Sequence, residues 1–560
     1  MSDGSTGQFR RSHGRSPRDL MVGAASGASA RTLPTTLWPM RGAIAAGHRL
    51  TAEAGAEILA EGGNAVDACL AAAFASWVTE SPLTGPGGGG FLLVHRARDR
   101  TDRLLDFFTA VPGQGSSDRV ELHMESIDID FDGSSSQVFL VGPGSCAVPG
   151  AAAGLEAAHR RYASLPWRRL LEPAIVLARD GVELTPPQAY LHAILDLILR
   201  HTPEGRAVYG ETGRITAGER LVMSDLSDTL ERLAENGAPE LYGGELGSAV
   251  VEHLQERGGL ITDADLAAYR VIWRRALRLP YERAAFVSNP PPSSGGILIG
   301  YGLTLLDRLA ASDEPGTAEA IAALVGVMAE QLRAREGTFA GDLHRGGLAR
   351  KLYAEETVRD ALQRLGRPAP TPGEQAGAPG TTHISVVDER GNAASLTAST
   401  GSGSGVVVPG TGIHLNNMLG EYDLNPLGRR VRPGSRLTSM MAPSLVLDDG
   451  RPRLVVGSAG SIRLRGAILQ IIVNVVHHDM PVEDAIAAPR IHLDEGRVHC
   501  EGGCDQAELD RLEALGYELV RWRRRNLYFG GASAVERLAD GSLAAAGDPR
   551  RGGHGIVVSA

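Results

Sequence analysis

A segment rich in proline and glycine, residues 366–380, divides this 560-residue chain into two parts with different periodicities. Repeated Pro and Gly cannot join a packed helix or strand, so we expect an exposed linker. Before it, residues 150–370 alternate amphipathic helical patterns with turns. After it, residues 382–388 and 393–399 alternate as strands around the turn residues 389–392, which predicts a β-hairpin. The linker therefore ends where a strand begins.

Two helices in tandem are predicted near the start of the regular pattern. Thr51 is expected to cap the first, which Gly62-Gly63 ends, and Asn64 to cap the second. A glycine run, residues 85–90, then leads into an apolar strand at residues 91–94. The run has G-x-G-x-x-G spacing, but a dinucleotide fingerprint follows a strand and opens a helix. The order here is helix, glycines, strand, so no dinucleotide cofactor is expected.

The C-terminal part combines strands with buried helices. A strand at residues 454–456 leads into a long helix at residues 464–477 that is apolar on most faces. Such a pattern favours an α/β fold in which sheets are covered by helices on both sides.

Composition excludes several chemistries. Only one of the 56 basic residues is lysine, Lys351, and its neighbours form neither a phosphate-binding loop nor a desolvated pocket for a Schiff base. The net charge of −10 argues against sequence-independent binding of nucleic acid. No run reaches the roughly 18 apolar residues of a membrane helix. The expected partner is a small-molecule substrate, with no nucleic acid and no membrane.

The four cysteines do not predict a disulfide scaffold, because they are few and scattered. His499-Cys500 with Cys504 fits no zinc spacing, so no metal is expected. Residues 1–38, rich in Ser, Gly and Arg, are interpreted as a flexible leader. Arg10-Arg11 and a weak apolar stretch resemble a twin-arginine export signal, but Arg18-Asp19 precedes that stretch directly. A cytoplasmic location is therefore favoured over export.

Gly380-Thr381 is the sharpest local candidate for chemistry. A threonine hydroxyl is a poor nucleophile, and an adjacent free α-amine can activate it as a base. Thr381 would acquire such an amine only if the chain were cut before it, and Gly380 tolerates the strained backbone of self-cleavage. A lone Gly-Thr pair is more often a turn that enters a strand, so the interpretation depends on context.

The context resembles the start of the small subunit in the gamma-glutamyltranspeptidase family of self-processing N-terminal-nucleophile hydrolases. The segment reads Gly380-Thr381-Thr382-His383-Ile384-Ser385-Val386-Val387-Asp388, followed by Gly391-Asn392 and His414-Leu415-Asn416-Asn417. Similar motifs occur in order over residues 41–558: Gly62-Gly63-Asn64-Ala65-Val66-Asp67-Ala68, the glycine run ending at Phe91, Val148-Pro149-Gly150, Pro173-Ala174-Ile175, Pro290-Pro291-Pro292-Ser293-Ser294-Gly295-Gly296, Gly457-Ser458-Ala459-Gly460-Ser461 and Ala488-Pro489-Arg490.

The resemblance implies a four-layer α-β-β-α sandwich made as one precursor. A cut between Gly380 and Thr381 would give a large subunit, residues 39–380, and a small one, residues 381–560, associated in one sandwich domain. A higher oligomer is left open. Thr381 would be the nucleophile for processing and catalysis, with its new amine as general base and then proton donor.

The resemblance also assigns supporting roles. Ser399 stands where the family usually has a threonine that hydrogen-bonds the nucleophile. Gly460 and Ser461 match the two consecutive backbone N–H donors of the oxyanion hole, each typically worth about 3 kcal/mol in the transition state.

The sequence departs from the family where glutamate is recognised. Phe108 aligns with the arginine that binds the substrate carboxylate, and only Ser439 remains of a serine pair whose second member is Met440. The positions that hold the α-ammonium align with Gly401, Met418 and Glu421, where the family usually has Asn, Gln or Glu, and Asp. Losing an arginine whose guanidinium pairs with a buried carboxylate costs about 3–5 kcal/mol of binding free energy, which lowers the affinity at least ~100-fold. Arg429, Arg430 or Arg463 could replace it, since all three lie near site segments.

Four functions follow from these departures. Phe108, Met418 and Met440 could line a more apolar pocket for an acyl compound other than glutathione. This first function would resemble that of the family members that are acylases. The second is the carbon–carbon bond hydrolysis that is assigned to other members, which make alkylated proline precursors of antibiotics. An ordinary glutathione hydrolase or transferase is the third function. An inactive homologue that acts as a binding protein is the fourth, and the retained Thr381 and Ser399 speak against it.

Overall fold

The computed structural model describes residues 1, 40–114, 124–130, 136–309, 314–365, 380–421 and 432–559. The chain divides into two compact units, Met1–Trp38 and Pro39–Ala560, and the second contains the helices and strands given below. Most of the expected leader and of the linker lies outside the described residues, as do Arg429 and Arg430.

The candidate nucleophile lies in an antiparallel sheet of seven strands. Its order is β22 (His554–Ser559), β1 (Met40–Ala46), β11 (Thr382–Asp388), β12 (Ala393–Ser399), β2 (Gly89–Arg96), β3 (Thr101–Phe107) and β8 (Ile272–Arg275). The predicted hairpin is confirmed, because β11 and β12 pair from Thr382↔Ala398 to Val387↔Ala393. The strand predicted after the glycine run is β2, which lies inside the sheet between β12 and β3.

The second sheet is antiparallel and has six strands. Its order is β21 (Leu543–Gly547), β20 (Gly531–Arg537), β16 (Arg451–Ala459), β15 (Ser444–Asp448), β10 (Ala284–Ser288) and β9 (Leu277–Tyr281). The strand predicted at residues 454–456 is the middle of β16.

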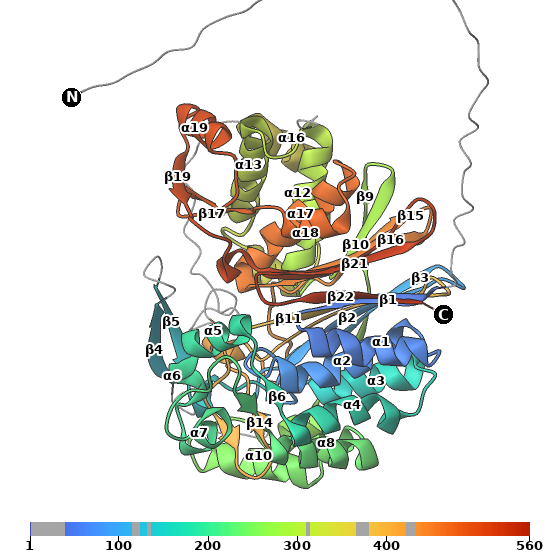
Figure 1. Ribbon diagram of the computed structural model, residues 1–560, viewed down its shortest axis with the longest axis vertical. Helices are drawn as coiled ribbons and strands as arrows, with labels where there is room; N and C mark the ends of the chain where they lie inside the picture. Colours follow the sequence, from blue (N-terminus) through green and yellow to red (C-terminus); the bar gives the residue numbers. More distant parts are fainter. Residues whose placement is uncertain are drawn as a thin grey trace, which may run out of the picture. The chain divides into compact units, whose positions relative to one another are not determined.

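The two sheets lie face to face, and helices cover their outer faces (Figure 1). Helices α1 (Arg49–Ala60), α2 (Ala65–Thr79) and α4 (Trp167–Asp180) lie beyond the seven-stranded sheet, and α12 (Gly295–Leu309) and α17 (Leu464–Val476) beyond the six-stranded one. Leu92 of β2 packs in the core cluster on the α2 side, whereas the next residue, Leu93, packs in the cluster that also contains Val455 and Ile468. Both faces of the strands are therefore buried, which explains their nearly continuous apolar runs.

One of the two predicted helix caps is confirmed, and the other is not. Asn64 forms the predicted cap of α2, with a capping box to Asp67. The first helix begins earlier than predicted, because the imidazole of His48 caps it by accepting from the N–H of Leu50 at 3.1 Å. Thr51 instead lies in the first turn with its buried hydroxyl 2.6 Å from that of Thr79. The expectation that Thr51 caps this helix is wrong, since its side chain bonds to α2.

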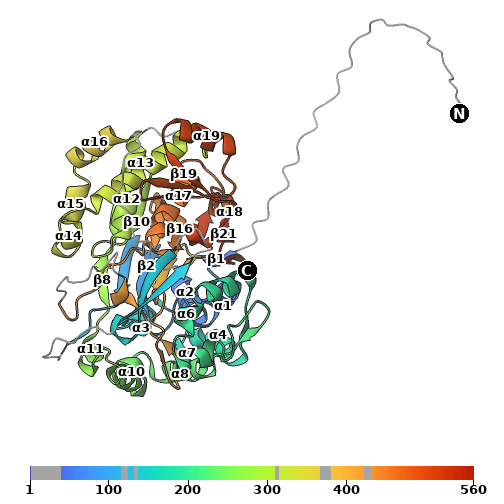
Figure 2. The ribbon, with the colours of Figure 1, turned by 90° about the vertical axis from the view of Figure 1, so that its left-hand side faces the viewer.

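The remaining elements lie around this sandwich. Figure 2 shows α14, α15 and α16 grouped beside α12 and α13, and α19 beside β19. Their bounds are β4 (Glu125–Asp130), β5 (Ser136–Val141), α3 (Ala151–Tyr162), β6 (Val182–Glu183), α5 (Pro186–Ile194), α6 (Asp196–Leu199), α7 (Pro203–Tyr209), β7 (Arg220–Leu221), α8 (Ser224–Asn236), α9 (Pro239–Tyr242), α10 (Glu245–Gln255), α11 (Asp263–Ala268), α13 (Ala318–Ala334), α14 (Phe339–Arg345), α15 (Leu348–Leu352), α16 (Glu355–Arg364), β13 (Val407–Val408), β14 (Ile413–His414), α18 (Val482–Ala487), β17 (Ile491–Asp494), β18 (Arg497–Cys500), α19 (Gln506–Ala514) and β19 (Glu518–Arg521). Within the described ranges, no helix is both long and apolar enough to span a bilayer.

Candidate active site

The hairpin register brings Thr381 opposite Ser399. Because Thr382 pairs with Ala398, the residue before β11 faces the last residue of β12. Thr381 is 5% exposed, and its Oγ1 donates to the carbonyl oxygen of Gly380 at 2.7 Å and lies 3.3 Å from Ser399 Oγ. Ser399 Oγ donates to the same carbonyl and accepts from the N–H of Gly401 at 2.8 Å. Two hydroxyls thus meet at the carbonyl of the peptide bond that precedes Thr381.

Close backbone contacts surround this peptide bond. A Cβ on Gly380 would lie 1.3 Å from the carbonyl oxygen of Gly401, so only glycine fits there. Gly401 has φ +72°, and a Cβ on it would lie 2.0 Å from Asn417 Oδ1 and 3.0 Å from Glu421 Oε1. The carboxylate of Glu421 therefore lies beside Gly401. The asparagine that the family usually carries at this position would clash with Asn417.

Gly460 and Ser461 form the turn between β16 and the short 3₁₀ helix Ser461–Arg463. Both have positive φ, +120° and +53°, and Ser461 is a non-glycine residue in the left-handed region. Their backbone N–H groups have no acceptor among the described residues, as an anion-binding turn requires.

Arg551 connects this turn to the nucleophile. Its Nη1 donates to the carbonyl oxygen of Thr381 at 3.2 Å. Its side chain also packs against Gly531, which pairs with Ala459 next to the turn. The structure thus brings Gly380, Thr381 and Ser399 into direct contact, with Glu421 beside Gly401. Arg551 contacts the carbonyl of Thr381 and also Gly531, the strand neighbour of the residue before Gly460.

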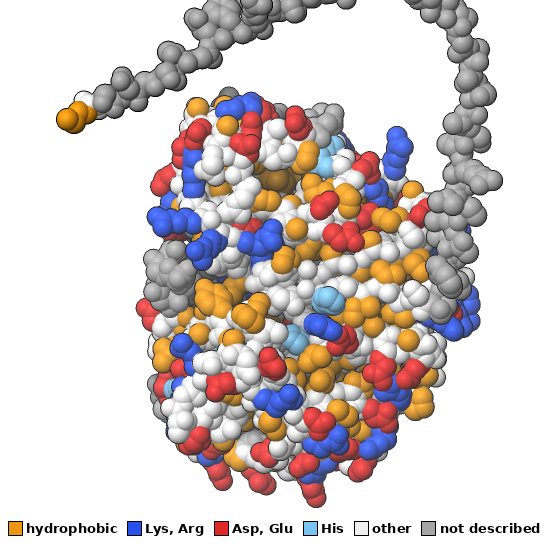
Figure 3. Space-filling view, viewed as in Figure 1, with side chains coloured by type: hydrophobic (Ala, Val, Ile, Leu, Met, Phe, Trp, Pro, Cys, Tyr) orange, Lys and Arg blue, Asp and Glu red, His pale blue; other side chains and the backbone are white. Residues whose placement is uncertain are grey.

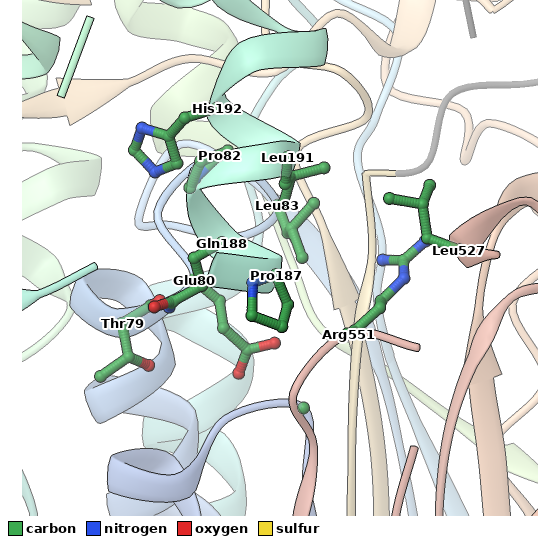
Figure 4. A pocket seen from close by; sticks show the side chains of 11 residues that line it. Thr79, Glu80, Pro82, Leu83, Pro187, Gln188, Leu191, His192, Leu527 and Arg551 are labelled. Carbon is green, nitrogen blue, oxygen red and sulfur yellow. The ribbon is translucent and has the colours of Figure 1, made fainter. Parts of the chain in front are cut away.

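A buried carboxyl that the sequence did not single out lies behind the nucleophile strand. Glu80, which ends α2, is 6% exposed, and its carboxylate accepts from Thr382 Oγ1 at 2.7 Å and Thr51 Oγ1 at 3.2 Å. Burial raises the pKa of Glu80 to about 7. Figure 4 shows its carboxyl and the guanidinium of Arg551 on either side of a cavity of about 20 Å³, room for about one water. The only sequence signal is an acidic residue between an apolar helix and the glycine run.

The residues expected to form an apolar pocket are packed in the core. Phe108 is 1% exposed and stacks on Phe91 with ring centroids 5.5 Å apart. Met418 and Met440, 2% and 1% exposed, belong to the same cluster of buried apolar residues. The three side chains therefore belong to the buried core and do not line an open pocket.

A buried ion-pair group next to Phe108 was also missed by sequence reasoning. Asp106 is fully buried and binds Arg436 Nε at 3.1 Å and Arg274 at 2.7 Å. The guanidinium of Arg436 also lies 4.5 Å above the ring of Tyr269, whose hydroxyl donates to the carbonyl of Phe108 at 2.8 Å. Arg436 thus forms its ion pair with a carboxylate of the protein itself.

Of the three arginines considered as replacements, only Arg463 is described. Its guanidinium lies 4.4 Å above the ring of Tyr528. Ser439 is held by its loop: its Oγ accepts from the N–H of Met441 at 3.1 Å, and its carbonyl accepts from the hydroxyls of Ser293 and Ser294 at 3.1 and 3.0 Å. Among the described residues, no group of three or more His, Cys, Asp or Glu side chains is placed to hold a metal ion.

Comparisons with known proteins show which family and fold this chain resembles. A family model described as gamma-glutamyltranspeptidase matches residues 51–558. Acylase ACY 1 proenzyme from a Pseudomonas species is 33% identical over 533 residues, covering 93% of this chain and 94% of that protein. Glutathione hydrolase proenzyme from Pseudomonas aeruginosa is 33% identical over 573 residues, covering 97% and 99%. The crystal structure of cephalosporin acylase from Bacillus halodurans shares the fold, with a TM-score of 0.80 at 23% identity over 95% of this chain and 99% of that chain.

The α/β fold and these matches define the chain as an enzyme that acts as a hydrolase or transferase. It belongs to the gamma-glutamyltranspeptidase family.

Proposed function

We propose that this chain is a self-cleaving hydrolase or acyltransferase that uses Thr381 as its N-terminal nucleophile and acts on an acyl substrate other than glutathione. The observation that carries the proposal is the contact of Thr381 Oγ1 and Ser399 Oγ with the carbonyl oxygen of Gly380. Two relatives are named proenzymes, which supports processing into a large subunit, residues 39–380, and a small one, residues 381–560. The two facing sheets with outer helices then form the four-layer sandwich of N-terminal-nucleophile hydrolases.

Processing begins when the hydroxyl of Thr381 attacks the carbonyl carbon of Gly380. A bond forms between Oγ1 and that carbon, the bond from carbon to the nitrogen of Thr381 breaks, and the nitrogen takes up a proton to become a free amine. Ser399 hydrogen-bonds the carbonyl oxygen on which negative charge develops. Water then hydrolyses the ester and leaves Gly380 as a carboxylate and Thr381 as a new N-terminus.

Turnover repeats the attack on an external acyl group. The amine of Thr381 takes the proton of its own hydroxyl and later donates it to the leaving group. The N–H groups of Gly460 and Ser461 receive the oxyanion. Glu421, beside Gly401, offers a carboxylate to a cationic group of the substrate.

The substrate proposal depends on position 108. The stacked pair Phe108 and Phe91 presents no charge, and Arg436 is bound to Asp106. Neither Phe108 nor Arg436 therefore offers a free charge to the α-carboxylate of glutamate, which favours an acyl substrate that lacks this carboxylate. Two relatives, named an acylase proenzyme and a glutathione hydrolase proenzyme, are each 33% identical to this chain, so the substrate proposal rests on the site residues.

Denaturing electrophoresis tests the nucleophile. Wild-type protein should give bands of about 40 and 19 kDa, in proportion to 380 and 180 residues of a 58.9 kDa chain. Thr381→Ala should give one uncut band, and Thr381→Ser, which keeps the hydroxyl, should still be cut. An uncut wild type would refute the mechanism.

Chromogenic anilides test the substrate. Wild type should hydrolyse a hexanoyl anilide and process a γ-glutamyl anilide at least ~100-fold less efficiently, because no arginine at position 108 binds the α-carboxylate. Phe108→Arg should shift this ratio towards γ-glutamyl, and Phe108→Leu, the matched control, should not. Efficient turnover of γ-glutamyl anilide by wild type would contradict the proposal, and cleaved protein inert to both would favour a binding role.

A further inference from the structure

An arginine-lined groove lies at the far end of the nucleophile strand. The groove has a volume of about 830 Å³ and is lined by the turns β2–β3, β11–β12 and β15–β16 and by the end of α3. Strand β11 spans Thr382–Asp388 between Thr381 and this groove, about 20 Å at ~3.3 Å per residue. The groove is therefore separate from the candidate active site.

Contacts between the turns fix the shape of the groove. The N–H of Ala97 donates to Asn392 Oδ1 at 3.0 Å, which joins the β2–β3 and β11–β12 turns. Gly450, with φ +72°, allows the side chain of Arg100 to lie against the β15–β16 turn, where a Cβ would stand 3.3 Å from Arg100 Cδ. Elements of both sheets thus contribute to one concave surface.

Arginines outnumber the acidic residues that line this groove. Seven arginines line it beside one carboxylate, Glu389, and six of the arginines form no ion pair with any described residue: Arg98, Arg100, Arg161, Arg390, Arg451 and Arg537. Glu389 pairs with Arg41, and Asp99 pairs with the seventh groove arginine, Arg96. Asp102 pairs with His95 and Arg278.

The rest of the molecule makes this concentration unusual. The chain carries a net charge of −10, and on the face seen in Figure 3 basic and acidic side chains are intermingled. Like charges gathered in one concavity repel one another unless an anion lies between them.

Several of these guanidinium groups are held in place before any ligand arrives. Arg161 lies over the ring of Trp273 at 4.5 Å, and Arg537 Nε donates to the carbonyl of Pro452 at 3.0 Å. A planar guanidinium can bind phosphate oxygens with two parallel hydrogen bonds. Because the charges are spread over three turns, a single phosphate would reach only part of them.

We propose that this groove binds a small anion that carries two or more linked phosphate groups. This binding does not depend on cleavage at Thr381 or on the acyl substrate, so it can be tested independently of the proposed function.

Isothermal titration calorimetry with sodium tripolyphosphate as the probe tests the site. The full chain carries Thr381→Ala, so that processing does not differ between samples. We expect one binding event per chain at low ionic strength, and weaker binding as salt is added. A triple variant, Arg98→Gln, Arg100→Gln and Arg451→Gln, should weaken binding at least about tenfold.

A matched triple variant controls for net charge. Arg214, Arg359 and Arg523 are exposed residues outside the groove, and their replacement by Gln removes the same total charge. This variant should bind tripolyphosphate within about twofold of the parent. Equal loss in both variants, or no binding by the parent, would overturn the site. Tighter binding of tricarballylate or of a hexaglutamate peptide than of tripolyphosphate would overturn the assignment to phosphate.

Discussion

The buried carboxyl of Glu80 makes the stability of this protein depend on pH in a way that one substitution should remove. Burial raises the pKa of Glu80 from its usual 4.5 to about 7 in the folded protein. The folded state therefore binds this proton more tightly than the unfolded chain does. The resulting stabilisation is complete below about pH 4.5 and is lost as pH rises through about 7.

The size of the effect follows from the difference between the two pKa values. It corresponds to about 3 kcal/mol of unfolding free energy in full, and about 2 kcal/mol of this falls between pH 5.5 and 8.5. Glu80→Gln does not titrate, and its amide can still accept from Thr382 and donate to Thr51. The substitution should therefore increase stability relative to wild type by about 1 kcal/mol at pH 5.5 and by about 3 kcal/mol at pH 8.5.

Urea unfolding at the two pH values measures this difference. Both proteins carry Thr381→Ala, which keeps each a single chain. Buried histidines such as His48 and His192, whose pKa burial lowers to about 4, lose stability at acid pH equally in both proteins and cancel. The exposed Glu211→Gln should track wild type at both pH values. If the difference between wild type and Glu80→Gln is the same at pH 5.5 and 8.5, the assignment of a raised pKa is wrong.

Three further substitutions probe contacts around the site. Ser399→Ala removes the acceptor of the Gly401 N–H and should slow self-cleavage at least about tenfold, whereas Ser399→Thr should restore it, as followed by electrophoresis over time. Asp106→Asn leaves the buried guanidinium of Arg436 without its counter-charge and should lower the unfolding free energy by about 3 kcal/mol in urea titrations; an unchanged midpoint would show that the pair is not needed. Gly457→Ala would place a methyl 2.3 Å from the ring of His383, whose two nitrogens are hydrogen-bonded. It should lower the unfolding free energy by about 1–3 kcal/mol and lower the melting temperature. The control Gly243→Ala, which has open space around it, should leave the melting temperature unchanged.

Local patterns in the sequence predicted the elements that depend on local chemistry. The hairpin β11–β12 followed from alternation around a turn, and the cap at Asn64 from one side chain two and three residues from its donors. The order of glycine run and strand argued against a dinucleotide loop, and the structure places that strand inside the sheet, between β12 and β3.

Contacts between distant segments left no such pattern. Glu80 and Thr382 are 302 positions apart, and Asp106 and Arg436 are 330 apart, so neither pair could be recognised from spacing. Thr51 looked like a cap because its role in binding Thr79 and Glu80 depends on how α1 packs on α2. Strands β1 and β22 were not predicted, and they pair with each other from opposite ends of the sequence, so no local turn marks them as a hairpin.

The place of β1 has a consequence for the order of events during synthesis. This strand is made among the first, yet its two neighbours are β11, next to the candidate cut, and β22, which ends at Ser559. The sheet around Thr381 can therefore close only after β22 has left the ribosome. If Thr381 needs the finished sheet to attack Gly380, the synthesis of β22 sets the earliest time of cleavage, and a truncation that removes β22 should leave an uncut precursor.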